Sequence, residues 1–586
     1  MADETANLNT VWAGLIIEEL VRNDVTMFCM APGSRCAPLT VAVARHPKAH
    51  SVVHFDERGA AYHALGFARA TGHPVAFVCT SGTAVANAMP AVVEASQSHT
   101  PLILLTADRP PELLDVRANQ AIDQTRIFGE YMRWDTVLPC PDLAMPPRMV
   151  LTTIDHAVYR ARRSPAGPVH INCMYREPLV SDTPDFGSLA HSTELADWFA
   201  DATPFTTTAI PATHIPDAEL RELAKLLDTV EHGLLVIGEL NTVAERQAAK
   251  ALASALNWPT APDVTSGLRF GEGGNPFLPY YDQALLSKIT QRLLSPSCVL
   301  HIGGPFVSKR LQKFVEESSP LHYIVIAEHP RRQDPGHRVS ARFEADIPEA
   351  CAQLALLVSR KPSDNRTREL QDQTDRIYDV LSTELEDAGD LSEPAVAFLV
   401  SRHAPADSVV FLGASMPIRD MDMFGSASSA RFRTAANRGA SGIDGNIATA
   451  AGYARALNAP VTAILGDLAA LHDLNSLALL QDLCSPLVLV VINNRGGGIF
   501  SFLPVAGQTD VFKEFFATPH DFDFANAATM FGLAYKTPAT PAAFVTAYQA
   551  ALQRNSATLI EVSSDRDANH RLHKSLQDKI VEWVEV

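Results

Sequence analysis

Long apolar runs are missing from this chain of 586 residues, and none approaches the roughly 20 residues that a membrane-spanning helix needs. We therefore expect no membrane span. The start, Met1-Ala2-Asp3-Glu4, is acidic and lacks the basic residues that open a signal peptide. The eight cysteines form no C-x-x-C pair, which argues against a zinc ribbon or a thioredoxin-like site. Scattered thiols of this kind indicate the reducing cytoplasm.

Positive charge is also in short supply, because the chain has 48 Lys and Arg residues and 66 Asp and Glu residues, which gives a net charge of −18. This balance argues against nucleic acid or an anionic membrane surface as a partner. The chain has neither the G-x-G-x-x-G nor the P-loop fingerprint of nucleotide-binding proteins, and no G-x-S-x-G hydrolase elbow. The remaining composition is that of a globular protein with about three domains.

Strand and helix patterns alternate along the chain, which predicts an α/β fold with parallel sheets covered by helices on both faces. In the first block we expect helices over residues 57–71 and 84–96. The expected strands of the three blocks are 25–30, 51–55, 74–79 and 101–106; 233–238, 298–303 and 322–327; and 408–413, 461–465, 486–492 and 558–562.

Two polar stretches separate the blocks, and we interpret the first as a linker. The first runs from 181 to about 218. The second runs from 331 to about 393 and contains a candidate solvated helix over 367–386. The first and third blocks have similar size and rhythm, which hints at two related domains.

The most informative pattern is Gly466-Asp467 after one apolar strand and Asn493-Asn494 after the next, joined by an expected crossover helix over 468–483. A strand–helix–strand unit brings both strand ends to one edge of a parallel sheet. A carboxylate and an amide oxygen would then lie side by side, as suits Mg²⁺ holding a phosphate. Asp467 alone could instead be a helix N-cap.

Other polar residues also follow predicted strands, where ligands bind in open α/β sheets. Asp56 and Glu57 begin a predicted helix and could serve only to complement its dipole. Arginines recur in Gly- or Ser-bearing loops, and a guanidinium suits bidentate carboxylate binding, although each alone could be a surface charge. These arginines are Arg35, Arg109, Arg419 and Arg438.

These stretches resemble the thiamine-diphosphate-dependent enzymes. Gly466-Asp467 with Asn493-Asn494 is similar to the motif by which that family binds diphosphate and Mg²⁺, with Leu468 where most members have glycine. The other similar stretches, which point to one subfamily in which this leucine is usual, are 31–35, 55–59, 80–83, 106–112, 119–122, 437–445, 466–476 and 497–500.

The resemblance implies an α/β fold of three doubly wound domains with mainly parallel sheets. They would be a pyrimidine-binding domain at 1–185, a central domain at 216–360 and a diphosphate- and Mg-binding domain at 393–586, with linkers at 186–215 and 361–392. The family's active site lies between subunits, which implies a homodimer or a homotetramer.

The resemblance also assigns roles to residues. Glu57 would be the catalytic glutamate that hydrogen-bonds the aminopyrimidine ring, and Ile443 would be the wedge that bends the cofactor. The metal, Mg²⁺ or alternatively Mn²⁺, would be held by Asp467, Asn494 and Gly496. Further cofactor contacts would come from Thr80, Ser415, Gly466, Leu468 and Ile499. Substrate contacts would come from Ser34, Arg35, Arg109, Gln120, Lys309, Arg310, Ser415, Arg419, Arg438, Ile499, Phe500 and Leu503.

In the subfamily that the motifs resemble, 2-oxoglutarate is decarboxylated and the succinyl-semialdehyde carbanion is added to isochorismate in menaquinone biosynthesis. Both substrates are carboxylates, in keeping with the arginines. One alternative is another thiamine-diphosphate carboligase or decarboxylase, such as an acetolactate synthase. A second is a non-catalytic nucleotide-binding or scaffold protein on the same fold.

Overall fold

The computed structural model describes residues 2–181, 195–271, 274, 276–359 and 365–585. The strands of this part of the chain form three sheets, and every strand pair in them is parallel. None of the helices in the described ranges is long and apolar enough to cross a membrane. The predicted α/β class with parallel sheets is confirmed.

The N-terminal sheet has the strand order β2-β1-β3-β4-β6-β5. Its strands are β1 (Met27–Met30), β2 (His50–Val53), β3 (Val75–Cys79), β4 (Leu102–Asp108), β5 (Trp134–Leu138) and β6 (Pro168–Met174). The four strands expected from the sequence are present, whereas β5 and β6 were not predicted. In β6 the buried polar residues His170 and Asn172 interrupt the apolar pattern that marks the other central strands.

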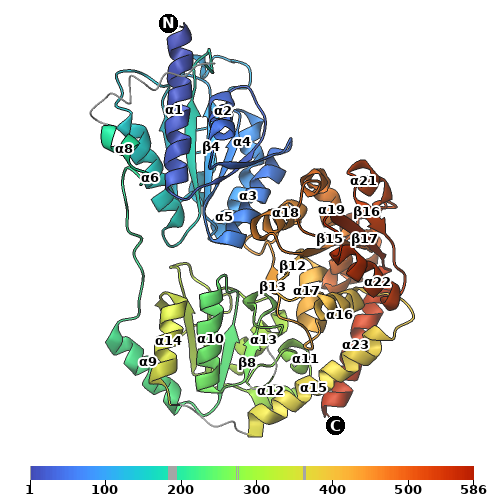
Figure 1. Ribbon diagram of the computed structural model, residues 1–586. Coiled ribbons are helices and arrows are strands. Elements are labelled where there is room, and N and C mark those ends of the chain that lie inside the picture. The colour runs from blue at the N-terminus through green and yellow to red at the C-terminus, as the bar shows by residue number, and fades with distance from the viewer. Residues whose placement is uncertain (1, 182–194, 272–273, 275, 360–364, 586) are drawn as a thin grey trace. The chain divides into compact units, whose positions relative to one another are not determined.

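Helices α1 (Ala2–Arg22), α2 (Ala37–Arg45) and α6 (Arg148–Arg162) share one hydrophobic core with this sheet (Figure 1). Helix α3 (Glu57–Thr71) has the predicted bounds and packs against β1 and β3. The helix expected over 84–96 is instead two helices, α4 (Thr83–Asn87) and α5 (Met89–Gln97). Pro90 is the second residue of α5 and has no amide hydrogen with which to continue α4.

The central sheet has the order β11-β10-β9-β7-β8. Its strands are β7 (Gly233–Ile237), β8 (Thr260–Pro262), β9 (Cys298–Ile302), β10 (His322–Ala327) and β11 (Ala341–Glu344). The accompanying helices are α9 (Asp217–Thr229), α10 (Val243–Leu256), α11 (Tyr281–Ala284), α12 (Lys288–Leu294), α13 (Lys309–Ser318) and α14 (Ile347–Leu357).

The polar, charged stretch from 331 to about 393 includes regular structure, because β11 and α14 fall within it. The helix expected over 367–386 is α15 (Asn365–Glu386), and it is not solvated all round. Leu370, Ile377 and Leu381 lie on one buried face, at the spacing of an amphipathic helix. The many charged residues on the other face had hidden this stripe.

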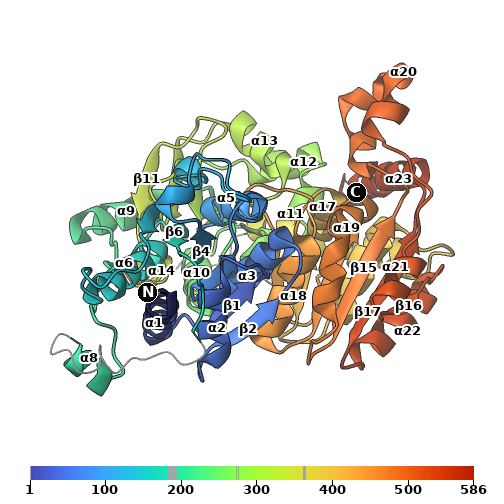
Figure 2. The ribbon, with the colours of Figure 1, turned by 90° about the horizontal axis from the view of Figure 1, so that it is seen from above.

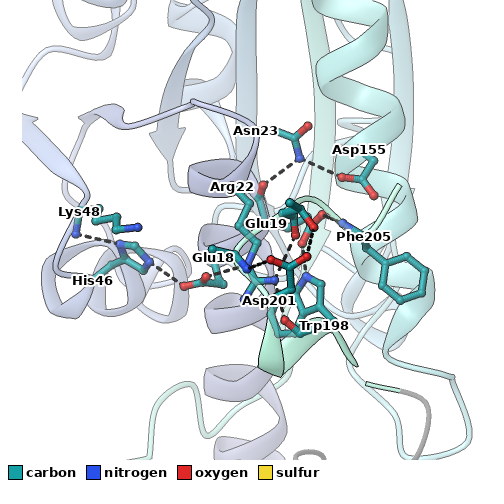
Figure 3. A network of polar contacts seen from close by, with 12 residues as sticks. Glu18, Glu19, Arg22, Asn23, His46, Lys48, Asp155, Trp198, Asp201 and Phe205 are labelled. Atoms are coloured by element: carbon teal, nitrogen blue, oxygen red, sulfur yellow. Dashed lines mark hydrogen bonds and ion pairs between the residues drawn. The ribbon is translucent and has the colours of Figure 1, made fainter. Parts of the chain in front are cut away.

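The described end of the first linker is held on helix α1 (Figure 3). In the short helix α8 (Ala196–Ala200), Trp198 donates from Nε1 to Glu19 Oε2 at 2.6 Å. The amide of Phe205 donates to the other oxygen of Glu19, also at 2.6 Å. The guanidinium of Arg22 lies 3.9 Å over the Trp198 ring. Residues 195–205 are therefore bound to the N-terminal core, while 182–194 lie outside the described residues.

The C-terminal sheet has the order β13-β12-β14-β15-β17-β16, which repeats the order of the N-terminal sheet. Its strands β15, β17 and β16 lie together at one side of the sheet (Figure 2). Its strands are β12 (Val409–Leu412), β13 (Arg433–Ala435), β14 (Val461–Gly466), β15 (Leu487–Asn493), β16 (Ala534–Lys536) and β17 (Ala557–Ser563). The helices of this part are α16 (Glu393–His403), α17 (Met416–Phe424), α18 (Asn446–Leu457), α19 (Asp467–His472), α20 (Thr509–Val511), α21 (Ala525–Met530), α22 (Pro541–Leu552) and α23 (Arg566–Glu585). The crossover helix expected over 468–483 is α19 followed by a 3-10 segment, Leu474–Leu480.

The chain forms two compact units. One comprises Met1–Pro211, Asn437–Asn458 and His472–Asp482, and the other comprises the rest. In the first unit α18 packs closely on α3, because a Cβ on Gly66 would lie only 2.1 Å from the Thr449 carbonyl oxygen. The domain limits expected from the sequence stay a prediction.

Candidate functional site

Asp467 and Asn494 lie at one edge of the C-terminal sheet, as their places after neighbouring strands predicted. Strands β14 and β15 are paired in parallel, with Gly466 opposite Ile492. Asp467 is buried at the start of α19. Its Oδ2 accepts a hydrogen bond from the Gly496 amide at 2.9 Å, which ties the loop after β15 to the carboxylate.

The Asn494 side chain is buried, and only the NH₂ group of its amide makes a hydrogen bond. Its Nδ2 donates to Glu393 Oε1 at 3.0 Å, whereas its Oδ1 is buried and finds no hydrogen-bond donor in the described part of the chain. A buried acceptor without a partner calls for a ligand or an ion. An amide oxygen beside a carboxylate fits a hard divalent cation.

The loop after β15 depends on glycine. Gly496 has φ +141°, and a Cβ there would lie 2.1 Å from the Ala517 carbonyl oxygen. His520 also contacts Asp467: its Nε2 lies 3.3 Å from Asp467 Oδ2, and its side chain is almost fully buried. Sequence reasoning missed His520 because it follows no strand and belongs to no motif.

The surroundings of Asp467 concentrate negative charge in a buried place. Burial raises the pKa of Asp467, although the amides of Gly496 and Leu468 act in the opposite direction. Burial also raises the pKa of Glu393, and the negative charge of Asp467 raises it further. The pKa of Asp420 is raised by burial and by Glu393. A divalent cation bound here would relieve this repulsion, so the donor set fits Mg²⁺.

In the unit that contains the N-terminal sheet, Asp56 and Glu57 have different surroundings. Asp56 is the N-cap of α3, and its side chain accepts from the Arg58 amide at 3.0 Å. Glu57 is half-buried, and its Oε2 accepts from Asn87 Nδ2 at 3.0 Å. Glu57 is therefore not used as the cap.

Arg109 and Gln120 meet at Ser81, which follows β3, and the buried Arg35 lies near Arg109. Arg109 donates to Ser81 Oγ, and Gln120 Nε2 donates to the Ser81 carbonyl at 2.9 Å. Arg35 donates to the Tyr175 carbonyl at 3.0 Å and to Glu177 at 2.7 Å. Burial lowers the pKa of Arg109, and the charge of Arg35 lowers it further. Two guanidiniums held together in this way suit an anionic ligand.

Apart from Thr80, the other predicted residues of this unit are less enclosed. Thr80 is buried beside Ser81, while Ser34 is exposed. Arg438 is half-buried, and Ile443 is 40% exposed. Ile443 is therefore not an ordinary core residue.

The remaining predicted residues belong to the unit that holds Asp467. Arg419 donates to the carbonyl of Ser415, a residue with φ +78° just before α17. Arg310 donates to the buried Asp282, whereas Lys309 is exposed. The last group lies where β14 passes directly into α19 and in the segment after β15. Gly466, Leu468, Ile499 and Phe500 are half-buried, and Leu503 is 37% exposed.

Three protein-family models match the chain along most of its length. The thiamine pyrophosphate enzyme N-terminal TPP binding domain matches residues 12–127, and the C-terminal TPP binding domain matches residues 421–562. A model described as the middle domain of thiamine pyrophosphate matches residues 190–412. The chain belongs to the thiamine pyrophosphate enzyme family. The resemblance stated from the sequence motifs is thereby confirmed.

Relatives of this thiamine pyrophosphate enzyme cover almost all of its length. A protein of Rubrobacter xylanophilus is 47% identical over 576 residues, which are 98% of this chain and 99% of the relative. One of Salinibacter ruber is 44% identical over 584 residues, 99% of this chain and 98% of the relative. One of Chlorobaculum tepidum is 43% identical over 577 residues, 98% and 97% of the two chains. All three are named 2-succinyl-5-enolpyruvyl-6-hydroxy-3-cyclohexene-1-carboxylate synthase.

Proposed function

We propose that this enzyme catalyses the reaction that its relatives are named for. It would decarboxylate 2-oxoglutarate and add the remaining four-carbon unit to isochorismate in a 1,4-addition, releasing CO₂, as a step of menaquinone biosynthesis. The observation that carries the thiamine-dependent chemistry is the buried, unpartnered Oδ1 of Asn494 at the sheet edge that also holds Asp467.

Thiamine diphosphate, when bound, supplies the electron sink that a 2-oxoacid decarboxylation needs. Mg²⁺, or Mn²⁺ in its place, would be held by the Asp467 carboxylate, Asn494 Oδ1 and the Gly496 carbonyl. Glu57 would hold a proton against the aminopyrimidine ring, a role that its half-buried carboxyl at the start of α3 can perform. The other cofactor contacts remain those expected from the family, at Thr80, Ser415, Ile443, Gly466, Leu468 and Ile499.

The two substrates are carboxylates, and Arg35 and Arg109 would bind one of them. Support comes from their burial and from the lowered pKa of Arg109, because an anion would neutralise two adjacent positive charges. Arg310 is already paired with Asp282 through one of its terminal nitrogens, so only its other N–H groups would bind a ligand. The other proposed substrate contacts are Ser34, Gln120, Lys309, Ser415, Arg419, Arg438, Ile499, Phe500 and Leu503.

Product analysis tests the proposed reaction. The enzyme is incubated with thiamine diphosphate, Mg²⁺ and 2-oxoglutarate, with and without isochorismate, and CO₂ and the coupled product are measured. We expect the coupled product only when both substrates are present. Turnover of pyruvate in place of 2-oxoglutarate would favour an acetolactate synthase-like enzyme, and failure to retain thiamine diphosphate would favour a non-catalytic protein.

The enzyme would act as a homodimer or a homotetramer with active sites shared between subunits, as the family resemblance implies. Mixing Glu57→Gln with Asp467→Ala subunits tests this arrangement. In random twofold hybrids one site of two would regain both residues, so activity should return to about a quarter of the wild-type value. No recovery after subunit exchange, verified by mass spectrometry, would place both residues of each site in the same subunit.

A further inference from the structure

Glu393 is a buried acid that no motif marks, yet it contacts a proposed metal ligand. It is the first residue of α16 and is only 1% exposed. Its Oε1 accepts from Asn494 Nδ2 at 3.0 Å and from Ser564 Oγ, also at 3.0 Å. One oxygen atom thus joins the start of α16 to the chain segments that follow β15 and β17.

This contact decides which end of the Asn494 amide is left for a ligand. The amide has a donor end and an acceptor end, and an acceptor such as Glu393 Oε1 binds only the donor end. Nδ2 is therefore turned towards Glu393, and Oδ1 is left free and buried. With the amide reversed, an N–H group would point at the cation site.

Gly498 makes room for the amide in this orientation. A Cβ at position 498 would lie 2.5 Å from Asn494 Nδ2, which is closer than atoms approach in folded proteins. The backbone at 498 is not in the left-handed region, so glycine is required there for space and not for its φ angle.

We propose that Glu393 is a positioning residue for the metal site. It holds the Asn494 amide so that Oδ1 can bind the divalent cation, and it does so as a hydrogen-bond acceptor and not through its charge. This inference rests on the proposed function, because it requires that Asn494 be a metal ligand. Outer partners of this kind typically change metal affinity by about 10- to 100-fold when they are removed.

The test measures Mn²⁺ binding to the full-length enzyme with thiamine diphosphate, using the electron paramagnetic resonance signal of free Mn²⁺. Glu393→Ala removes the acceptor, and we expect Mn²⁺ to bind about 10- to 100-fold more weakly. Glu393→Gln keeps an acceptor oxygen but has no charge, and it should bind within about threefold of wild type. Unchanged affinity in Glu393→Ala would overturn the proposal, as would equal losses in the two variants, since the charge would then be the property that matters.

Three further variants separate the possible outcomes. Ser564→Ala removes the second hydrogen bond to Glu393 Oε1 but leaves Asn494 in place, and it should match wild type. Gly498→Ala displaces the amide without altering Glu393, so it should weaken Mn²⁺ binding even if Glu393→Ala does not fold, and unchanged affinity would contradict the proposal. Asn494→Ala tests the proposed function itself. Wild-type affinity there would remove the metal assignment, whereas a loss there with none in Glu393→Ala would remove only the role of Glu393.

Discussion

The N-terminal and C-terminal sheets share one strand order but present opposite chemistry at corresponding strand ends. Strand β4 ends at Asp108 and is followed by Arg109, whereas its counterpart β15 is followed by Asn494. Strand β3 leads to Thr80 and Ser81, whereas its counterpart β14 leads to Asp467. The same strand order thus places a guanidinium and hydroxyls after β3 and β4 of the N-terminal sheet. It places carboxylate and amide oxygens after β14 and β15 of the C-terminal sheet. The ligand is decided by a few residues after the strands and not by the topology.

The largest expected effect is on the cation-binding edge. Asp467→Ala removes a ligand and the anchor of the Gly496 amide, so Mg²⁺ and thiamine diphosphate should bind about 100-fold more weakly or worse. Calorimetric titration of the cofactor in the presence of Mg²⁺ measures this. Asp521→Ala, at a fully exposed carboxylate next to His520, is the control and should bind the cofactor normally. Unchanged affinity in Asp467→Ala would place the metal elsewhere.

The next effect concerns the acid at the start of α3 in the N-terminal half. Glu57→Gln should lower turnover by roughly 100-fold or more, because the variant cannot exchange a proton with the cofactor ring. Steady-state rates at saturating cofactor measure it. The neighbouring Asp56→Asn retains a good N-cap and should keep normal turnover, which separates catalysis from capping. Near-normal turnover in Glu57→Gln would contradict its role.

A smaller effect should distinguish the anion-binding edge. Arg109→Ala should raise the KM of one carboxylate substrate by roughly 10- to 100-fold, since a charged hydrogen bond contributes about 1.5–3 kcal/mol. Arg419→Ala, in the C-terminal half, should do the same for one of the two substrates. The control is Arg126→Ala, at an arginine whose side chain is 79% exposed, and its KM values should not move. If neither Arg109→Ala nor Arg419→Ala changes a KM value, these arginines do not bind substrate.

The smallest effect is on stability and belongs to the N-terminal half alone. Burial raises the pKa of Glu19 to about 8, and the nearby Asp155 contributes. Below the unfolded value of 4.5 both states hold the proton, and between 4.5 and about 8 only the native state holds it. The free energy of unfolding should therefore fall as pH rises through this window, by at most about 1.4 kcal/mol per pH unit for one proton.

Thermal unfolding of Glu19→Gln from pH 5 to pH 8 tests this, and the variant should show a flatter dependence on pH whatever its absolute stability. Glu112→Gln is the control. A hydrogen bond from Arg176 lowers the pKa of Glu112 to about 2, so its contribution is lost only below pH 4.5. The same slope in Glu19→Gln and wild type would show that Glu19 holds no extra proton.

Much of this molecule could be predicted from residues that are adjacent in sequence. Apolar runs predicted the central strands. The places of Asp467 and Asn494 after β14 and β15 predicted that the two residues lie at one sheet edge, because parallel strands end at a common edge. The buried face of α15 and the strand β6 were missed. In both, polar residues obscure the periodicity, and only burial in the folded core shows which side is inward.

By itself, then, the sequence determined the fold class, the family and the chemical type of each sheet edge, since these depend on local order along the chain. The tertiary structure alone decided that Glu393, 101 residues from Asn494 in sequence, orients the amide of that residue. It also decided that Arg35 and Arg109 are buried as neighbours and that His520 reaches Asp467. Such contacts arise from the packing of distant segments, and no periodicity or spacing in the chain records them.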